Sequence, residues 1–265
     1  MSATVQHQPV TVKVEALHER GQIQQLFYLV ESDERIAAVI RLLGHYRPES
    51  TLIFCNTRKD CQELAEALDA RGFAALAIHG DLEQRERDQV LARFANKSVS
   101  VLVATDVAAR GIDIKDLSAV INFELTRDPE VHIHRIGRTG RAGEQGLALS
   151  LVMAAENRRA AAIEEYLGET VPRAELESLA MPASAALEAP MVTLCIDGGR
   201  KNKVRPGDIL GALTGEAGIP GSEVGKIDVF DFHTYVAIRR ASARHALAQL
   251  GAHKIKGRFF KVRKF

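Results

Sequence analysis

The sequence predicts two units: an α/β unit built on a mostly parallel sheet with helices on both faces, followed by a smaller α+β unit. Three observations predict this. Apolar, β-rich runs alternate with amphipathic helical stretches from about residue 22 to residue 152. The strand runs are continuously apolar, which is typical of strands covered on both faces. After the Ala/Pro-rich stretch "MPASAALEAP" both the pattern and the charge change.

These changes set the expected domain limits. We expect an N-terminal extension over residues 1–20 that is a remnant of an interdomain linker, and the α/β unit over 21–170. A linker over 171–190 then leads to the small unit at 191–265.

The elements of the first unit follow from periodicity and capping. Strands are expected where the sequence reads "TLIFC", "AALAI", "VSVLVAT", "AVINF" and "LALSLV", and helices at "RKDCQELAEALDARG", "DLEQRERDQVLARF" and "AENRRAAAIEEYL". Thr57 and Asp81 are expected helix N-caps, because Asp60 and Gln84 each follow three residues later. Gly72 stands where a left-handed helix C-cap is expected.

The second unit reads as βαββαβ. Strands are expected at "VTLCI", "GKIDVFD", "TYVAIR" and "KIKGRFFKVR", and helices at "PGDILGALTGEAG" and "SARHALAQLG". This is the order of a split βαβ sandwich and of an RNA-recognition motif.

Composition excludes several classes of protein. The chain of 265 residues is 46% apolar and 26% charged, without the apolar run of a membrane span or an opening secretory signal. Its three cysteines form no CxxC pair and have no matching histidines, so neither a disulfide framework nor a metal site is expected. We expect a reduced, cytoplasmic protein with no membrane partner.

Charge is distributed unevenly. Residues 1–190 carry 21 Lys and Arg against 28 Asp and Glu, whereas residues 191–265 carry 14 against 6. A separate basic unit favours a polyanionic partner, above all nucleic acid, although such a block is also compatible with a solvated face.

Four polar clusters follow apolar strands of the predicted sheet: "NTR", "HGD", "TDVAARGID" and "HRIGRTGR". Ligands of open parallel sheets bind at the carboxyl ends of the strands, so their shared edge is the candidate site. Thr57 and Thr105 offer hydroxyls to a phosphate oxygen, and Arg87 lies on a helix that begins beside the same edge. Several of these residues also have a structural explanation: Thr57 and Asp81 as helix N-caps, and His79 as a core histidine.

The same stretches resemble a known family. "LIFCNTR", "AIHGDLEQRERDQVLARF", "VLVATDVAARGIDI" and "HRIGRTGRAG" are similar to the conserved blocks of the second RecA-like domain of DEAD-box RNA helicases. The tail, with "TLCIDGGRKNKVRPGDILGALTGEAGIPGSEVGKIDVF" and "KIKGRFFKV", resembles the RNA-binding domain of the DbpA branch.

The resemblance implies a shared nucleotide site. In the family, ATP with Mg²⁺ lies between two RecA-like domains, and the first supplies the glycine-rich phosphate loop and the Asp-Glu-Ala-Asp box. Neither motif occurs here. The chain thus resembles a C-terminal half whose partner is an N-terminal RecA-like domain that mainly binds the ATP, and alone it is expected not to hydrolyse ATP.

Site residues follow by resemblance at matching positions. Arg138 and Arg141 correspond to the arginine fingers that reach the γ-phosphate and act as catalytic residues. His134, Arg135, Arg110 and Asp113 are assigned to the ATP site; the first two couple it to RNA, and Asp113 contacts the ribose. The RNA backbone contacts of the helicase core are assigned to Thr57, Gly80, Gln84, Arg87, Thr105 and Asp106.

Specificity is expected from the tail. Its sheet keeps one aromatic residue of the usual RNA platform, Tyr235, and has Thr193, His233 and Ile238 at positions where aromatics are common. Basic residues are expected to compensate: Arg200, Lys201, Lys203, Arg205, Lys254, Lys256, Arg258, Lys261 and Arg263.

The DbpA resemblance implies recognition of a structured element of large-subunit ribosomal RNA during ribosome assembly. Nonspecific electrostatic steering by a basic surface is the alternative for the tail. For the whole chain, a stand-alone RNA-binding adaptor competes with the helicase half. A different α/β enzyme with its own nucleotide site would need a phosphate loop, and none is visible.

Overall fold

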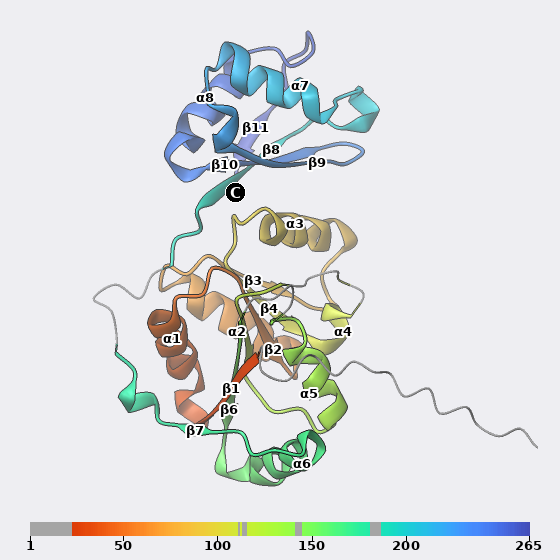
Figure 1. Cartoon of the computed structure of the whole chain (residues 1–265). Coiled ribbons are helices and arrows are strands. Elements are labelled where there is room, and N and C mark those ends of the chain that lie inside the picture. The colour runs from red at the N-terminus through yellow and green to blue at the C-terminus, as the bar shows by residue number, and fades with distance from the viewer. Residues whose placement is uncertain (1–22, 111, 113–115, 141–144, 181–186) are drawn as a thin grey trace, which may run out of the picture.

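The computed structural model describes residues 23–110, 112, 116–140, 145–180 and 187–265. They form two sheets, one of seven strands and one of four, each with its own hydrophobic core (Figure 1). In this part of the chain no helix combines the length and apolar character that a membrane crossing requires.

The first sheet has the strand order β3-β4-β2-β5-β6-β1-β7, and all its pairings are parallel. Its strands are β1 (Ile23–Leu29), β2 (Thr51–Cys55), β3 (Ala75–Ile78), β4 (Val101–Thr105), β5 (Ala119–Asn122), β6 (Gly146–Val152) and β7 (Arg173–Ala174). The predicted mostly parallel sheet is therefore confirmed. The two-residue β7 falls within the stretch expected to be a linker and extends the sheet beyond β1.

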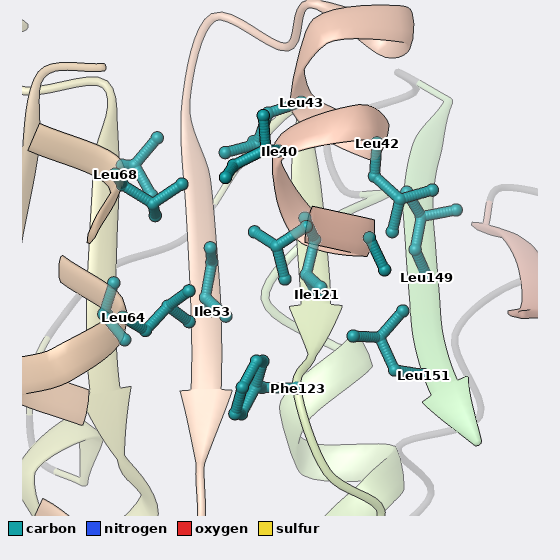
Figure 2. Packing of buried hydrophobic residues seen from close by; sticks show 14 of the residues in the cluster. Ile40, Leu42, Leu43, Ile53, Leu64, Leu68, Ile121, Phe123, Leu149 and Leu151 are labelled. Atoms are coloured by element: carbon teal, nitrogen blue, oxygen red, sulfur yellow. The ribbon is translucent and has the colours of Figure 1, made fainter. Parts of the chain in front are cut away.

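Helices cover both faces of this sheet, as the continuous apolar strands predicted. They are α1 (Arg35–Tyr46), α2 (Arg58–Asp69), α3 (Gln84–Ala95), α4 (Asp106–Ala109), α5 (Pro129–Ile136) and α6 (Asn157–Leu167). On one face, leucines of α1 and α2 pack against Ile53, Ile121 and Leu149 (Figure 2). On the other, Phe94 of α3 packs with Phe54 and Leu102. The strand β1 and the helices α1, α4 and α5 had no individual prediction.

The capping predictions are confirmed in two cases and wrong in one. Thr57 caps α2 by accepting a hydrogen bond from the Asp60 amide at 3.1 Å, and Gly72 has a left-handed φ of 82°. Asp81 does not cap α3: the N-cap residue is Glu83, whose backbone N–H donates to the Glu86 carboxylate at 2.9 Å. The Asp81 carboxylate instead accepts from Arg58, which the spacing rule could not reveal because Arg58 is distant in sequence.

The second sheet is antiparallel in the order β11-β8-β10-β9. Its elements are β8 (Met191–Ile196), α7 (Pro206–Gly211), β9 (Val224–Val229), β10 (Thr234–Arg239), α8 (Ala243–Ala252) and β11 (Val262–Lys264), so the βαββαβ order is confirmed. The expected strand at 254–263 is wrong in extent, because Lys256 and Gly257 have φ of 51° and 79° and turn the chain. The expected helix at 206–218 ends early in a π-helical segment, Ala212–Glu216.

One face of the second sheet is covered by α3 and the segment that follows it. The side-chain amide of Asn96 donates to Thr193 Oγ1 at 2.9 Å, and the Thr193 hydroxyl donates to Ser98 Oγ at 2.8 Å. Ala92 of α3 packs with Cys195 and Tyr235. In Figure 1, α3 lies against the second sheet, whose own helices α7 and α8 occupy the far side.

Candidate functional site

The sheet order brings three of the four predicted polar clusters together. The expectation for the fourth, "HRIGRTGR", is wrong: its described residues follow no strand but lie at the end of α5 and just after it, where the Leu117 backbone N–H, ahead of β5, donates to the Arg138 carbonyl at 3.2 Å. Strands β3, β4 and β2 are adjacent, so the residues that follow them share one edge. We call this surface the core edge; it consists of Thr57, Gly80, Gln84, Arg87, Thr105 and Asp106.

The two threonines of the core edge are helix N-caps. Thr105 Oγ1 accepts from the Ala108 amide at 3.4 Å, as Thr57 does from Asp60. Thr57 is exposed, whereas Thr105 is buried. The structural explanation for these residues is therefore present in the fold, and their contact with RNA stays a prediction.

Of the other core-edge residues, Gly80 and Gln84 are exposed, whereas Arg87 and Asp106 are half-buried. Gly80 is exposed, and a Cβ built on it would come no closer than 3.8 Å to Arg58, so packing does not require glycine there. Gln84 is exposed and donates to Asp88 at 2.7 Å. Arg87 donates to the Ala108 carbonyl at 3.3 Å, which links α3 to α4. An exposed main chain flanked by amide and guanidinium donors suits a phosphodiester backbone.

His79, beside this edge, behaves as a core histidine. It is buried, its Nδ1 accepts from the Asp81 amide at 3.4 Å, and its Nε2 lies 3.4 Å from Gln62 Oε1.

Arg135 is the centre of a buried polar network. Its side chain is 1% exposed. Its Nε and Nη2 donate to the two oxygens of Asp106, each at 2.7 Å. The remaining donors reach Asn122 Oδ1 at 3.3 Å, the Glu124 carbonyl at 2.9 Å and Asn56 Oδ1 at 3.1 Å.

All five N–H donors of this guanidinium are therefore used inside the protein. Its Cζ atom also lies 5.1 Å from the centre of the Phe54 ring. Arg135 thus holds the Asp106 carboxylate of the core edge against α5. In this arrangement it is a positioning residue, because it has no donor left for a nucleotide.

The network continues through residues that the sequence analysis did not single out. The Glu124 carboxylate accepts from the backbone N–H of Asn56 at 2.8 Å and lies 3.3 Å from the Arg35 guanidinium. Arg35 also pairs with the buried Glu156 at 2.6 Å. These partners are separated by long stretches of sequence, so no local spacing indicates them.

His132 lies on the buried face of α5, one turn before Arg135. Burial, helped by the nearby Arg135 charge, lowers its pKa to about 4. His132 is therefore neutral at physiological pH.

The expected nucleotide side is described in part. Arg138 follows α5, is half-buried and donates to the Ile112 carbonyl at 3.3 Å; among the described residues it has no carboxylate partner. His134 and Arg110 are exposed. Asp113 and Arg141 lie outside the described residues. The roles assigned to all of these residues stay predictions.

The basic residues of the tail come together from two stretches of sequence. Lys256 Nζ donates to the Lys203 carbonyl at 2.9 Å and lies 3.6 Å from Asp208, which joins the turn before β11 to the segment after β8. The members that are exposed are Arg200, Lys201, Lys203, Arg205, Lys254, Lys256, Arg258 and Lys261. Arg263, on β11, instead pairs with Asp197.

Tyr235 is placed differently from these residues. Its side chain is among the largest that are fully buried, packed with Phe230, Phe265 and Ala92. Burial raises the pKa of its hydroxyl to about 12. While α3 covers this face, the ring is not open to a base, so the predicted RNA contact of Tyr235 requires the two units to separate.

Comparison with known proteins matches both units. Residues 34–143 match the Helicase conserved C-terminal domain, and residues 193–264 match the DbpA RNA binding domain. The chain belongs to the DbpA-type DEAD-box family. It corresponds to the C-terminal part of such a protein.

Individual relatives agree. The chain is 51% identical, over 99% of its length, to the ATP-dependent RNA helicase DbpA of Escherichia coli, and 34% identical, over 96%, to that of Bacillus subtilis. It spans 57% of each of these relatives.

Solved structures match the first unit. A DEAD box protein from Methanococcus jannaschii aligns with a TM-score of 0.55 at 42% identity, covering 58% of this chain and 42% of that one. The E. coli DEAD-box protein SrmB, solved bound to RraA, aligns with a TM-score of 0.57 at 35% identity, covering 64% of this chain and 99% of that one. The predicted RecA-like fold of the first unit is confirmed.

Proposed function

We propose that this chain is the part of an ATP-dependent DEAD-box RNA helicase that completes the ATP site and carries the RNA-targeting domain. The observation that supports this most is the match to both family domains in one chain, together with the arginine-rich end of α5 and the polar core edge. The whole protein would use RNA-stimulated ATP hydrolysis to open short duplexes.

The catalytic proposal concerns Arg138 and Arg141. Phosphoryl transfer depends on neutralising the charge that develops on the γ-phosphate, and a guanidinium does this with a fixed, forked geometry. ATP and Mg²⁺ would be bound mainly by an N-terminal RecA-like domain, while Arg110, Asp113 and His134 approach the nucleotide from this side. Arg135 would act indirectly, because it fixes Asp106 and so links α5 to the core edge.

In the RNA proposal, the core edge contributes affinity and the tail contributes specificity. The core edge would hold the sugar-phosphate backbone without reading bases. The exposed basic group of the tail would bind a structured element of large-subunit ribosomal RNA in the cytoplasm, which points to a role in ribosome assembly. We also propose domain limits of 21–170 and 191–265, with the linker between them.

Reconstitution tests the enzymatic proposal. The purified chain alone should not hydrolyse ATP, whereas mixing it with an N-terminal RecA-like domain of the same family and RNA should produce RNA-stimulated hydrolysis. Hydrolysis by the chain alone would contradict the proposal, and a mixture that binds RNA without hydrolysing ATP would favour the adaptor.

RNA competition tests the targeting proposal. The chain should bind a hairpin of large-subunit ribosomal RNA more tightly than random RNA of equal length at moderate salt. Equal affinities would leave only electrostatic steering.

A further inference from the structure

A groove of about 700 Å³ lies between α3 and the second unit. Its lining from α3 includes Gln84, Arg85 and Asp88; the second unit contributes the turn between β9 and β10 together with Arg200, Asp197 and Arg263. The groove therefore exists only because the two units pack together.

Aromatic rings form one wall of the groove. Phe230 and His233 are stacked, with ring centres 4.8 Å apart and planes inclined by 14°. Phe232, in the same turn, is 70% exposed, which is unusual for so large an apolar side chain. Burial and the charges of Arg85 and Arg263 lower the pKa of His233, so this wall is uncharged at neutral pH.

The charges of the groove leave one cation available. Asp197 pairs with Arg263, Asp231 lies 4.0 Å from Arg200, and Asp88 accepts from Gln84. Each lining carboxylate thus already has a polar or charged partner. Arg85 is exposed and has no ion pair among the described residues.

The groove also joins the two surfaces assigned to RNA. Gln84 belongs to the core edge, and Arg200 belongs to the exposed basic group of the tail. An RNA strand that runs from the core edge to the exposed basic group of the tail can therefore follow this groove.

We propose that the groove binds an unpaired RNA segment, with one base stacked on Phe232 and the adjoining phosphate near Arg85. Exposed aromatic rings beside arginines are the common means of holding single-stranded nucleic acid, and such stacking tolerates any base. This proposal rests on the proposed RNA-binding function and adds a single-strand site that spans both units.

The sequence contains no tryptophan, so a Phe232→Trp variant of the full chain carries a single fluorescent reporter in the groove. The probes are an RNA hairpin and the same hairpin with an unpaired oligouridine tail of about six nucleotides. At saturation, established by anisotropy of end-labelled RNA, the tailed hairpin should quench the tryptophan strongly and the plain hairpin should not.

Affinity provides a second readout that does not depend on the reporter. Phe232→Ala should weaken binding of the tailed hairpin about ten-fold and leave the plain hairpin unchanged. Tyr166→Ala is the matched control, since Tyr166 is a 60% exposed aromatic residue on α6 and should affect neither RNA.

The outcomes separate the two proposals. If both RNAs bind equally, with no quenching and no effect of Phe232→Ala, the groove proposal is overturned while RNA binding stands. If neither RNA binds, the proposed function fails, and the groove proposal fails with it.

Discussion

Replacing Arg135 with methionine should destabilise the first unit strongly. The change removes five hydrogen bonds and leaves Asp106, Asn56, Asn122 and the Glu124 carbonyl without their donor. Breaking a buried ion pair by removing one partner costs about 3–5 kcal/mol. Because the Asp106 side chain is 28% exposed and can be partly rehydrated, we expect the lower end, about 3 kcal/mol.

Urea unfolding followed by far-UV circular dichroism measures this loss. Arg58→Ala is the matched control: its ion pair with Asp81 joins side chains that are 63% and 59% exposed, and such surface pairs contribute below about 1 kcal/mol. Adding Asp106→Asn to Arg135→Met should cost less than the sum of the two single changes, because they remove the same pair. An Arg135→Met chain no less stable than Arg58→Ala would refute the network reasoning.

Three further predictions concern other parts of the molecule. The pKa of His132 falls from 6.5 to about 4 on folding, so the unfolded chain binds the proton first as the pH is lowered. Its contribution to stability is therefore full above pH 6.5 and declines toward pH 4. In urea unfolding at several pH values, His132→Gln should flatten this decline of the midpoint. Thr193→Val removes the hydroxyl that joins Asn96 and Ser98 and should make the buried Cys195 react roughly five-fold faster with a thiol reagent, whereas Thr214→Val, away from that face, should not. Arg87→Ala should weaken RNA binding equally for all sequences and reduce the slope of log affinity against log salt by about 1; a sequence-dependent loss would argue for base contacts instead.

The local sequence pattern was sufficient to predict most elements of the fold. Each predicted strand of the first unit overlaps an observed strand, because continuous apolar runs such as "TLIFC" are fully buried in β2. The helix start at Thr57 was also predictable, because a cap and its partner are close in sequence. The start of α3 was not, because Asp81 is the better cap by residue type and the partner that engages it, Arg58, is remote in sequence.

The candidate site was predictable as an edge but not as a network. Strand ends indicate where polar residues gather, and the family resemblance adds their expected roles. Neither indicates that all the N–H donors of Arg135 bind groups inside the protein, because its partners come from four separate elements or loops. Nor could the sequence pattern show that α3 covers Tyr235, because the pattern of a strand does not identify which element packs on each of its faces.

The central claim is that Arg138 completes a catalytic centre with the other RecA-like domain. The most direct measurement is the ATP hydrolysis rate of the reconstituted pair at saturating ATP and RNA, with wild-type chain, Arg138→Lys and Arg138→Ala. We predict a loss of about 1000-fold for Arg138→Ala and little rescue by lysine, with ATP and RNA binding retained. Hydrolysis by Arg138→Ala at the wild-type rate would contradict the account.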